Sequence, residues 1–187
     1  MVAVPMPVLR TTAAFVTGGA IFVAMPLRRM LVCAAGLALA APAGAVAARA
    51  PWATVNVCDT ASNPDTVGIR GSMPGTGSAT DEMFMRFQVQ YQREDGSWRL
   101  LGPTGDSGFI DAGRARTRTA RQAGQSFRLS PPRAGNVYTV RGLVTFEWRG
   151  KDGTVTRRTR KRTTAGHRST AGADPAGFSA GECTVTA

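Results

Sequence analysis

The chain has little of the residue types on which metal binding and nucleophilic catalysis depend. Its 187 residues include one histidine, three cysteines and two tyrosines. Zinc sites in proteins are built from cysteine and histidine ligands at short spacing, and His167 has no such neighbour in the sequence. The acidic pattern of a calcium-binding loop is missing as well. We therefore expect neither a metal site nor a cofactor.

Acidic residues are absent from the first fifty positions, which follow the order of an export signal. Two arginines precede an apolar run over residues 31–41, and small residues follow that run. This succession of cationic, apolar and small-residue regions is typical of a secretory signal peptide. We expect cleavage after Ala45 or Ala47, which leaves a domain over residues 48–187. The protein is then secreted, extracellular or part of the cell envelope.

The region before the domain, residues 1–47, is longer than the usual signal of ~15–30 residues. Translation that starts at Met25 or Met30 would give a signal of ordinary length. The alternative is that Thr11–Leu27 spans a membrane, because its length reaches the lower limit of the ~17–25 residues that a bilayer helix needs. We favour a misassigned start or a long signal, with residues 1–24 as an N-terminal extension.

Two cysteines remain once the signal is removed. Cys33 lies within the apolar run and leaves with it, whereas Cys58 and Cys183 lie near the two ends of the domain. An even pair of cysteines in an exported chain is typical of a disulfide. The bond would close a loop of 125 residues, for which the chain-entropy model gives roughly 4–5 kcal/mol of stabilisation. We predict this disulfide; two unpaired thiols are the alternative.

The domain is cationic. Four of the chain's 23 lysines and arginines lie before Pro51, so 19 of them face all 12 acidic residues, a net charge of about +7. A positive surface favours anionic partners such as cell-wall polymers, acidic lipids or nucleic acid. For an exported protein we expect an anionic cell-wall polymer or another envelope protein rather than a specific nucleic acid. Membrane contact is expected only through an uncleaved N-terminal segment.

Alternation with a period of two residues dominates the domain. Apolar residues alternate with mostly polar ones over residues 83–91 and again over residues 137–148, which predicts half-buried strands. Gly142 interrupts the second run, where we expect a bulge or a close neighbouring backbone. Turn signals at Glu94–Gly96 and Lys151–Gly153 predict hairpins. Further strands are predicted at 54–58, 66–71, 98–100, 116–121, 126–129, 154–164 and 182–186.

Helical periodicity over three turns is not found in the domain. The predicted strands, with glycine, proline, asparagine or aspartate between them, indicate one all-β domain, an antiparallel β-sandwich of about 7–9 strands. Residues 72–80 and 165–181 are rich in glycine and serine or threonine, and we expect loops there. The second loop should cross back and bring Cys183 towards Cys58.

Two segments resemble immunoglobulin-like modules. Gln88–Trp98 reads QVQYQREDGSW and is similar to the C–C′ hairpin of fibronectin type III domains, and Tyr138–Arg141 resembles the tyrosine-led F strand of the same group. The resemblance implies a single immunoglobulin-like β-sandwich. Such modules usually bind or space other molecules and rarely catalyse, although a fold does not fix a function. The cysteines depart from the group, because immunoglobulin domains join strands B and F.

A few polar residues could in principle support catalysis. His167 is followed by Ser169, Asp174 and Ser179, and a Ser-His-Asp triad depends on geometry rather than on sequence order. The segment is a glycine-rich loop, so we interpret His167 as a surface residue in a polar turn and expect no catalytic residue.

Three groups of acidic residues could also be considered: Asp81 with Glu82, Glu94 with Asp95, and Asp106 with Asp111. Paired carboxylates can act as acid and base. These pairs have turn-like surroundings, and we expect them to cap or solvate loops.

Arginine-rich runs are the strongest functional lead. In the segment RARTR an extended chain would place Arg114, Arg116 and Arg118 on one face, with neighbours ~6.6–7 Å apart. A second run carries cations on both faces, namely Arg157, Arg158, Arg160, Lys161 and Arg162. Such a strand should lie at a sheet edge, where its charges also keep two sheets from joining. The alternative is a polyanion-binding strip whose affinity falls steeply with salt.

Two tryptophans have an arginine beside them in sequence, at Trp98-Arg99 and Trp148-Arg149. These pairs could add cation–π contacts, or the tryptophans could belong to the core. We conclude that the chain is a non-enzymatic binding or structural module of the cell envelope that contacts anionic polymers through its arginine-rich strands. A small secreted hydrolase or inhibitor with active groups elsewhere is the alternative.

Overall fold

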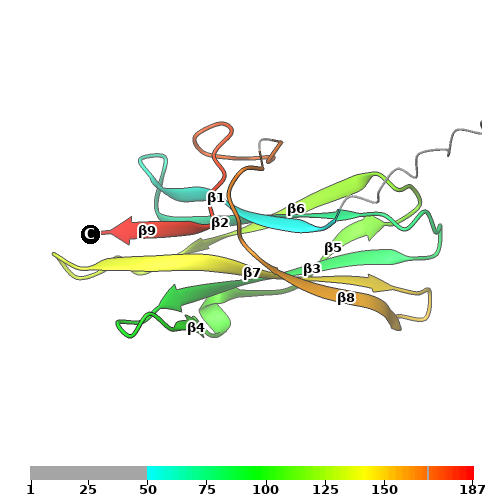
Figure 1. Ribbon diagram of the computed structural model, residues 1–187, viewed down its shortest axis with the longest axis horizontal. Helices are drawn as coiled ribbons and strands as arrows, with labels where there is room; N and C mark the ends of the chain where they lie inside the picture. The colour runs from blue at the N-terminus through cyan, green and yellow to red at the C-terminus, as the bar shows by residue number, and fades with distance from the viewer. Residues whose placement is uncertain (1–49, 168) are drawn as a thin grey trace, which may run out of the picture. The chain divides into compact units, whose positions relative to one another are not determined.

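The computed structural model describes residues 50–167 and 169–187. These residues form two antiparallel sheets, and Figure 1 shows them as two layers. The smaller sheet has the order β1–β2–β6 and consists of β1 (Trp52–Thr60), β2 (Asn63–Pro74) and β6 (Ala120–Arg128). The larger sheet has the order β4–β3–β7–β8, with β5 also paired to β3 and β9 to β7. Its strands are β3 (Glu82–Gln92), β4 (Trp98–Leu100), β5 (Asp106–Arg114), β7 (Val137–Arg149), β8 (Val155–Arg162) and β9 (Glu182–Thr186), and a short 3-10 turn, η1 (Pro103–Gly105), links β4 to β5.

The predicted all-β sandwich is confirmed. The signal region, the starts at Met25 or Met30, the cleavage sites after Ala45 or Ala47 and the span over Thr11–Leu27 lie outside the described residues. Within the part that the structure describes, no helix has the length and apolar character to cross a membrane.

The core fills the space between the two sheets. On β3 the predicted alternation is confirmed, since Met83, Met85, Phe87 and Val89 are fully buried. The inward residues of β7 continue this core across the sheet, and Trp148 extends it to the other layer by donating its indole N–H to the carbonyl of Pro74 at 3.0 Å. The alternating residues therefore hold the two sheets together at one apolar interface.

Gly142 lies in an unbroken register, which corrects the predicted bulge. Val89 of β3 is opposite Gly142, and the pairing runs on without a shift from Tyr91 to Glu82. A Cβ atom on Gly142 would lie 2.7 Å from Cγ2 of Thr163 and 2.8 Å from Cγ2 of Ile69. The close neighbours are thus side chains, one of them from the opposite sheet, and the glycine makes room for them.

The loop over residues 165–181 returns along the edge of β1 that β2 leaves open. Val55 and Ala180 exchange backbone hydrogen bonds of 2.9 and 3.0 Å. The chain then enters β9, where Cys183 forms a disulfide with Cys58 of β1, with 5.4 Å between the Cα atoms. The predicted disulfide and the return of the loop are both confirmed. The bond joins β1, in one sheet, to β9, in the other.

The main error in the predicted strands concerns the segment before β6. Residues 115–119 form a loop rather than part of a strand over 116–121, and β5 precedes it where no strand was predicted. Pairing of β5 with β3 is interrupted by two register shifts, so its sequence shows no clean two-residue period. β8 pairs with β7 alone and lies at the sheet edge, as its charges predict.

Candidate cationic face

Strand β8 presents cations on both of its faces. Arg158, Arg160 and Arg162 lie opposite Glu147, Thr145 and Leu143 of β7, whose neighbours in sequence point into the core. These three arginines therefore face outward, away from the smaller sheet. Arg157 and Lys161 lie opposite the core residues Trp148 and Val144 and belong to the inward-facing side of the edge. We call the outward row Arg158, Arg160 and Arg162 the β8 arginine row.

Only one end of the β8 arginine row is neutralised by a carboxylate of the described residues. Arg158 Nε lies 2.6 Å from Glu147 Oε1, and Arg149 Nη2 lies 2.7 Å from Glu147 Oε2. Glu147 is 1% exposed. Burial pushes the pKa of Glu147 up, but the hydrogen bonds and charges of the two arginines outweigh it, so its pKa lies below its ordinary value. No carboxylate of the described chain lies within 4.0 Å of Arg160 or Arg162.

The positive charge continues from β8 onto β7. Arg141 lies on the same outward face as Arg162, because Arg162 is opposite Leu143, two residues further along β7. Burial lowers the pKa of Arg141 and the charge of Arg162 lowers it further, while the charge of Glu182, which is paired with Arg141 on β9, raises it. The Arg141 guanidinium lies 3.9 Å from the ring centroid of Trp98 and donates to Gln90 at 3.0 Å. Trp98 and Gln90 thus hold Arg141 flat against the sheet.

A second group of outward residues joins arginine to phenylalanine on β3, β5 and β7. The guanidinium of Arg149 lies 4.1 Å from the ring centroid of Phe84 and 4.7 Å from that of Phe109. The Arg86 guanidinium lies 5.9 Å from the ring centroid of Phe109 and pairs with Asp106. Asp106 neutralises Arg86, whereas Arg149 shares the single charge of Glu147 with Arg158 of the β8 arginine row.

Neither tryptophan contacts the arginine next to it in sequence, and the core position predicted for Trp148 is confirmed. Trp98 contacts Arg141 rather than Arg99, and Trp148 is fully buried with Arg157 at 4.6 Å from its ring centroid. Residues adjacent on a strand point to opposite faces, so the arginine comes from another strand. Arg157 comes from β8, which pairs with β7, and Arg141 comes from β7, on the other side of β3 from Trp98. These contacts can be identified only when the pairing of residues between strands is known.

The other arginine-rich run does not form the predicted strip. Arg114 is the last residue of β5 and lies opposite Glu82 of β3 on the outward face. Ala115 is buried, and its carbonyl accepts a hydrogen bond from Gly77 at 2.9 Å. The chain leaves the sheet there, so Arg116 and Arg118 are carried by the loop that leads to β6. The extended conformation that would align the three arginines is therefore absent from this segment.

His167 belongs to the loop that covers the edge of β1. Its ring stacks on Trp52, with 4.3 Å between centroids, and its Nε2 lies 2.9 Å from the hydroxyl of Thr164. Burial lowers the pKa of His167. Asp174 does not contact this ring, because its carboxylate accepts hydrogen bonds from Thr60 and Asn63. Asp174 is therefore not placed to orient the His167 ring as the acid of a triad would.

Ser179 is the central residue of a G-x-S-x-G pentapeptide, Gly177–Gly181. In an α/β-hydrolase this pattern places a nucleophile on a turn between a strand and a helix. Here Ser179 Oγ lies 2.7 Å from the hydroxyl of Thr54 and accepts the backbone N–H of His167 at 2.9 Å. The segment runs beside β1 and leads into β9, so these contacts fasten the loop to the sheet instead of presenting a nucleophile.

The acidic groups have structural roles. Asp106 follows the η1 turn as the first residue of β5 and accepts the backbone N–H of Gly108 at 3.0 Å, so its predicted turn setting is confirmed. It also accepts hydrogen bonds from Arg86 and from Gln88 at 2.9 Å. The hydrogen bond from Arg86 is the main cause that lowers the pKa of Asp106. Asp95 and Asp111 accept backbone N–H groups two residues later in sequence. No three histidine, cysteine or acidic side chains of the described residues cluster as a metal site would require.

No known protein family matches the sequence, and no curated protein matches it either. Among solved structures the chain is similar to Pseudomonas fluorescens alkylpurine DNA glycosylase AlkC bound to DNA containing an abasic site analog, with 10% sequence identity over 60% of this chain. The similarity covers 28% of that chain, and the TM-score is 0.26. A likeness at this level carries no argument about function.

Proposed function

We propose that this domain is a non-enzymatic binding module that contacts anionic polymers of the cell envelope through the β8 arginine row. The observation that carries the proposal is the pair Arg160 and Arg162. Both are exposed on the outward face of an edge strand, and neither is paired with a carboxylate of the described residues. Their two-residue spacing of ~6.6–7 Å suits successive charges on an extended polymer.

Arg141 enlarges the positive surface next to this pair. It lies on the same face, and its pKa is lowered in part by Arg162. Two nearby cations without a full counter-charge leave a local positive potential, which attracts anions and is screened by salt. An anionic polymer laid along β8 would relieve the repulsion between Arg141 and Arg162.

Two structural features support the rest of the proposal. The sheet order places the first, second and sixth strands in one layer and the third, seventh and eighth in the other, which corresponds to strands A, B and E against C, F and G of an immunoglobulin-like sandwich. The Cys58–Cys183 disulfide favours an oxidising location. We therefore propose an immunoglobulin-like module that is secreted or held at the cell envelope.

The test is retention on a polyphosphate column as a function of salt. Arg160→Ser/Arg162→Ser should elute at lower salt than the unmodified domain, because each lost phosphate contact reduces the slope of log K against log salt by roughly 0.7–0.9. The matched control is Arg128→Ser/Arg133→Ser, which removes the same charge from exposed positions at the end of β6 and on the loop before β7. Equal elution of the two double variants would contradict the proposal.

A second measurement distinguishes binding from edge protection. Charged side chains on an edge strand also prevent association between sheets. If that were their only role, Arg160→Ser/Arg162→Ser would aggregate at high protein concentration while retaining the salt profile of the control on polyphosphate.

A further inference from the structure

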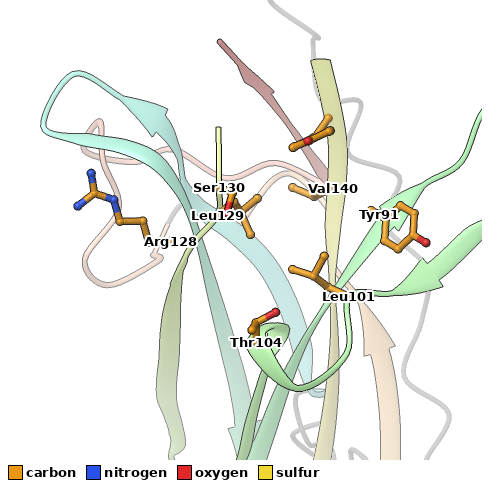
Figure 2. Close-up of a pocket in the computed structure, with 8 residues that line it drawn as sticks. Tyr91, Leu101, Thr104, Arg128, Leu129, Ser130 and Val140 are labelled. Atoms are coloured by element: carbon orange, nitrogen blue, oxygen red, sulfur yellow. The ribbon is translucent and has the colours of Figure 1, made fainter. Parts of the chain in front are cut away.

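A cavity of about 420 Å³ opens between the two sheets beyond the end of β6. Its lining comes from β3, β7, the β4–η1 segment and the end of β6, and it consists of Tyr91, Leu101, Thr104, Arg128, Leu129, Ser130, Tyr138 and Val140. Figure 2 shows Leu101 and Thr104 on one side of the opening and Leu129 on the other. Ligand cavities in proteins have volumes of ~300–1,000 Å³, so this volume suits a small molecule.

The cavity exists because the two sheets differ in extent. β6 ends at Arg128, whereas β3 and β7 continue past that point on the other sheet. Tyr91 lies opposite Val140 and shares its inward face, and Tyr138 follows on the same face of β7. These two tyrosines are the only ones in the chain, and they are 37% and 42% exposed. Two aromatic rings of the core-facing side are therefore left partly uncovered.

The walls have the chemistry of an amphiphile site. Leu101, Leu129 and Val140 provide aliphatic surface that is buried or half-buried. Four hydroxyl groups lie around them, on Tyr91, Thr104, Ser130 and Tyr138, and none appears in a side-chain hydrogen bond with the described residues. An apolar interior with a few polar groups at its margin is typical of small-molecule sites.

Positive charge is placed at the margin of the cavity. Arg128 lines the cavity where β6 ends, but Figure 2 shows its guanidinium turned away from Leu101 and Val140. Arg99 of β4 lies opposite Tyr91, on the same face of the sheet. No carboxylate of the described residues lies within 4.0 Å of either arginine. The margin therefore complements an anionic group.

We propose that this cavity binds a single-chain fatty carboxylate. The acyl chain lies against Leu101, Leu129 and Val140 between the sheets, and the carboxylate stays at the margin near Arg99, which is paired with Tyr91. This site is separate from the β8 arginine row, which is on the outward face of the larger sheet. The proposal does not depend on polymer binding.

The experiment measures binding of sodium dodecanoate to the full chain by isothermal titration calorimetry, below its micelle concentration. The unmodified protein should bind one molecule saturably. Ser130→Trp places an indole at the mouth of the cavity from an exposed position and should weaken binding at least tenfold. Thr104→Trp blocks the mouth from the other side. It is used in place of Ser130→Trp if circular dichroism shows that Ser130→Trp does not fold.

The role of charge is tested with a matched pair of variants. Arg99→Gln should weaken dodecanoate binding severalfold and leave binding of uncharged dodecanol unchanged. Arg133→Gln removes the same charge from an exposed residue that does not line the cavity, and it should bind both probes like the unmodified protein. Arg160→Ser/Arg162→Ser should also bind dodecanoate normally, which separates this site from the proposed polymer face.

Three results would overturn the proposal: no saturable binding of dodecanoate, equal affinity in the unmodified protein and the mouth-blocking variants, or equal affinity in Arg99→Gln and Arg133→Gln. The last result would mean that the carboxylate does not lie near Arg99.

Discussion

The rings of Trp52 and His167 are stacked with an angle of 7° between their planes. The stack fastens the start of β1 to the loop over residues 165–181, which also covers the open edge of that strand. Because one partner is a histidine, the contact depends on pH near neutrality. No other side chain of the described residues has its ordinary pKa in that range.

Burial lowers the pKa of His167 below its ordinary value of 6.5. The unfolded chain therefore takes up this proton first as pH falls. Stability from the neutral ring is fully present above pH 6.5 and is lost as pH falls through the lower pKa of the folded state. We expect tryptophan fluorescence to change over that range in the unmodified protein. His167→Phe keeps an aromatic stack without a proton, and an identical pH profile in that variant would contradict the assignment.

The disulfide should make a large contribution to stability. Cys58→Ser/Cys183→Ser removes a cross-link between residues 125 apart, for which the chain-entropy model predicts a loss of roughly 4–5 kcal/mol as an upper figure. Urea unfolding of the two proteins measures the difference. Reductant should shift the unmodified protein towards the variant and leave the variant unchanged. A loss below about 1 kcal/mol would show that the unfolded chain gains little freedom when the loop is opened.

Gly142 should not tolerate a methyl group. In Gly142→Ala the new Cβ would meet Thr163 and Ile69 at 2.7 and 2.8 Å, and overpacking of this kind typically costs ~1–3 kcal/mol. Thr163→Ser removes the nearer methyl group and keeps the hydroxyl that accepts the Gly142 N–H. The double variant Gly142→Ala/Thr163→Ser should therefore lose less unfolding free energy than the two single variants lose together. Gly181→Ala is the control, since its Cβ would have no neighbour closer than 3.5 Å.

Removal of the Glu147 carboxylate should leave two arginines without their shared partner. Loss of one member of a buried ion pair costs ~3–5 kcal/mol, and we expect Glu147→Ala to fall at the lower end because Arg158 is 55% exposed. The pKa of Glu147 is lowered in the folded state, so its contribution is present above the ordinary value of 4.5 and disappears as pH falls through the folded-state pKa. The difference in unfolding free energy between the unmodified protein and Glu147→Gln should therefore become smaller as pH falls below 4.5. A difference that does not change with pH would contradict this role.

The sequence predicts those elements in which one face is apolar and the pairing is regular. β3 and β7 were recognisable because Met83, Phe87, Val144 and Phe146 recur every second residue. The cationic β8 was placed correctly at an edge because charges on both faces cannot be buried. β5 was not predicted because its sequence lacks a regular two-residue alternation. Two register shifts and two glycines at positive φ, Gly108 and Gly113, interrupt it.

The candidate site was only partly predictable for a related reason. Which arginines share a face depends on the register between strands, and a single strand contains no information about its partner. Arg158, Arg160 and Arg162 could be placed because they follow one strand. The contact of Arg141 with Trp98 and the cavity beyond Arg128 arise between segments that are distant in sequence, so neither had a local signal.

The bond between Cys58 and Cys183 also determines how the domain transmits tension. A pull applied between Ala50 and Ala187 would pass through short pieces of β1 and β9 and through the sulfur–sulfur bridge. The 125 residues that the bridge encloses, including β8 and the cavity, lie outside this path. A module tethered at both ends would therefore keep β8 and the cavity undistorted while the structures to which it is attached move apart.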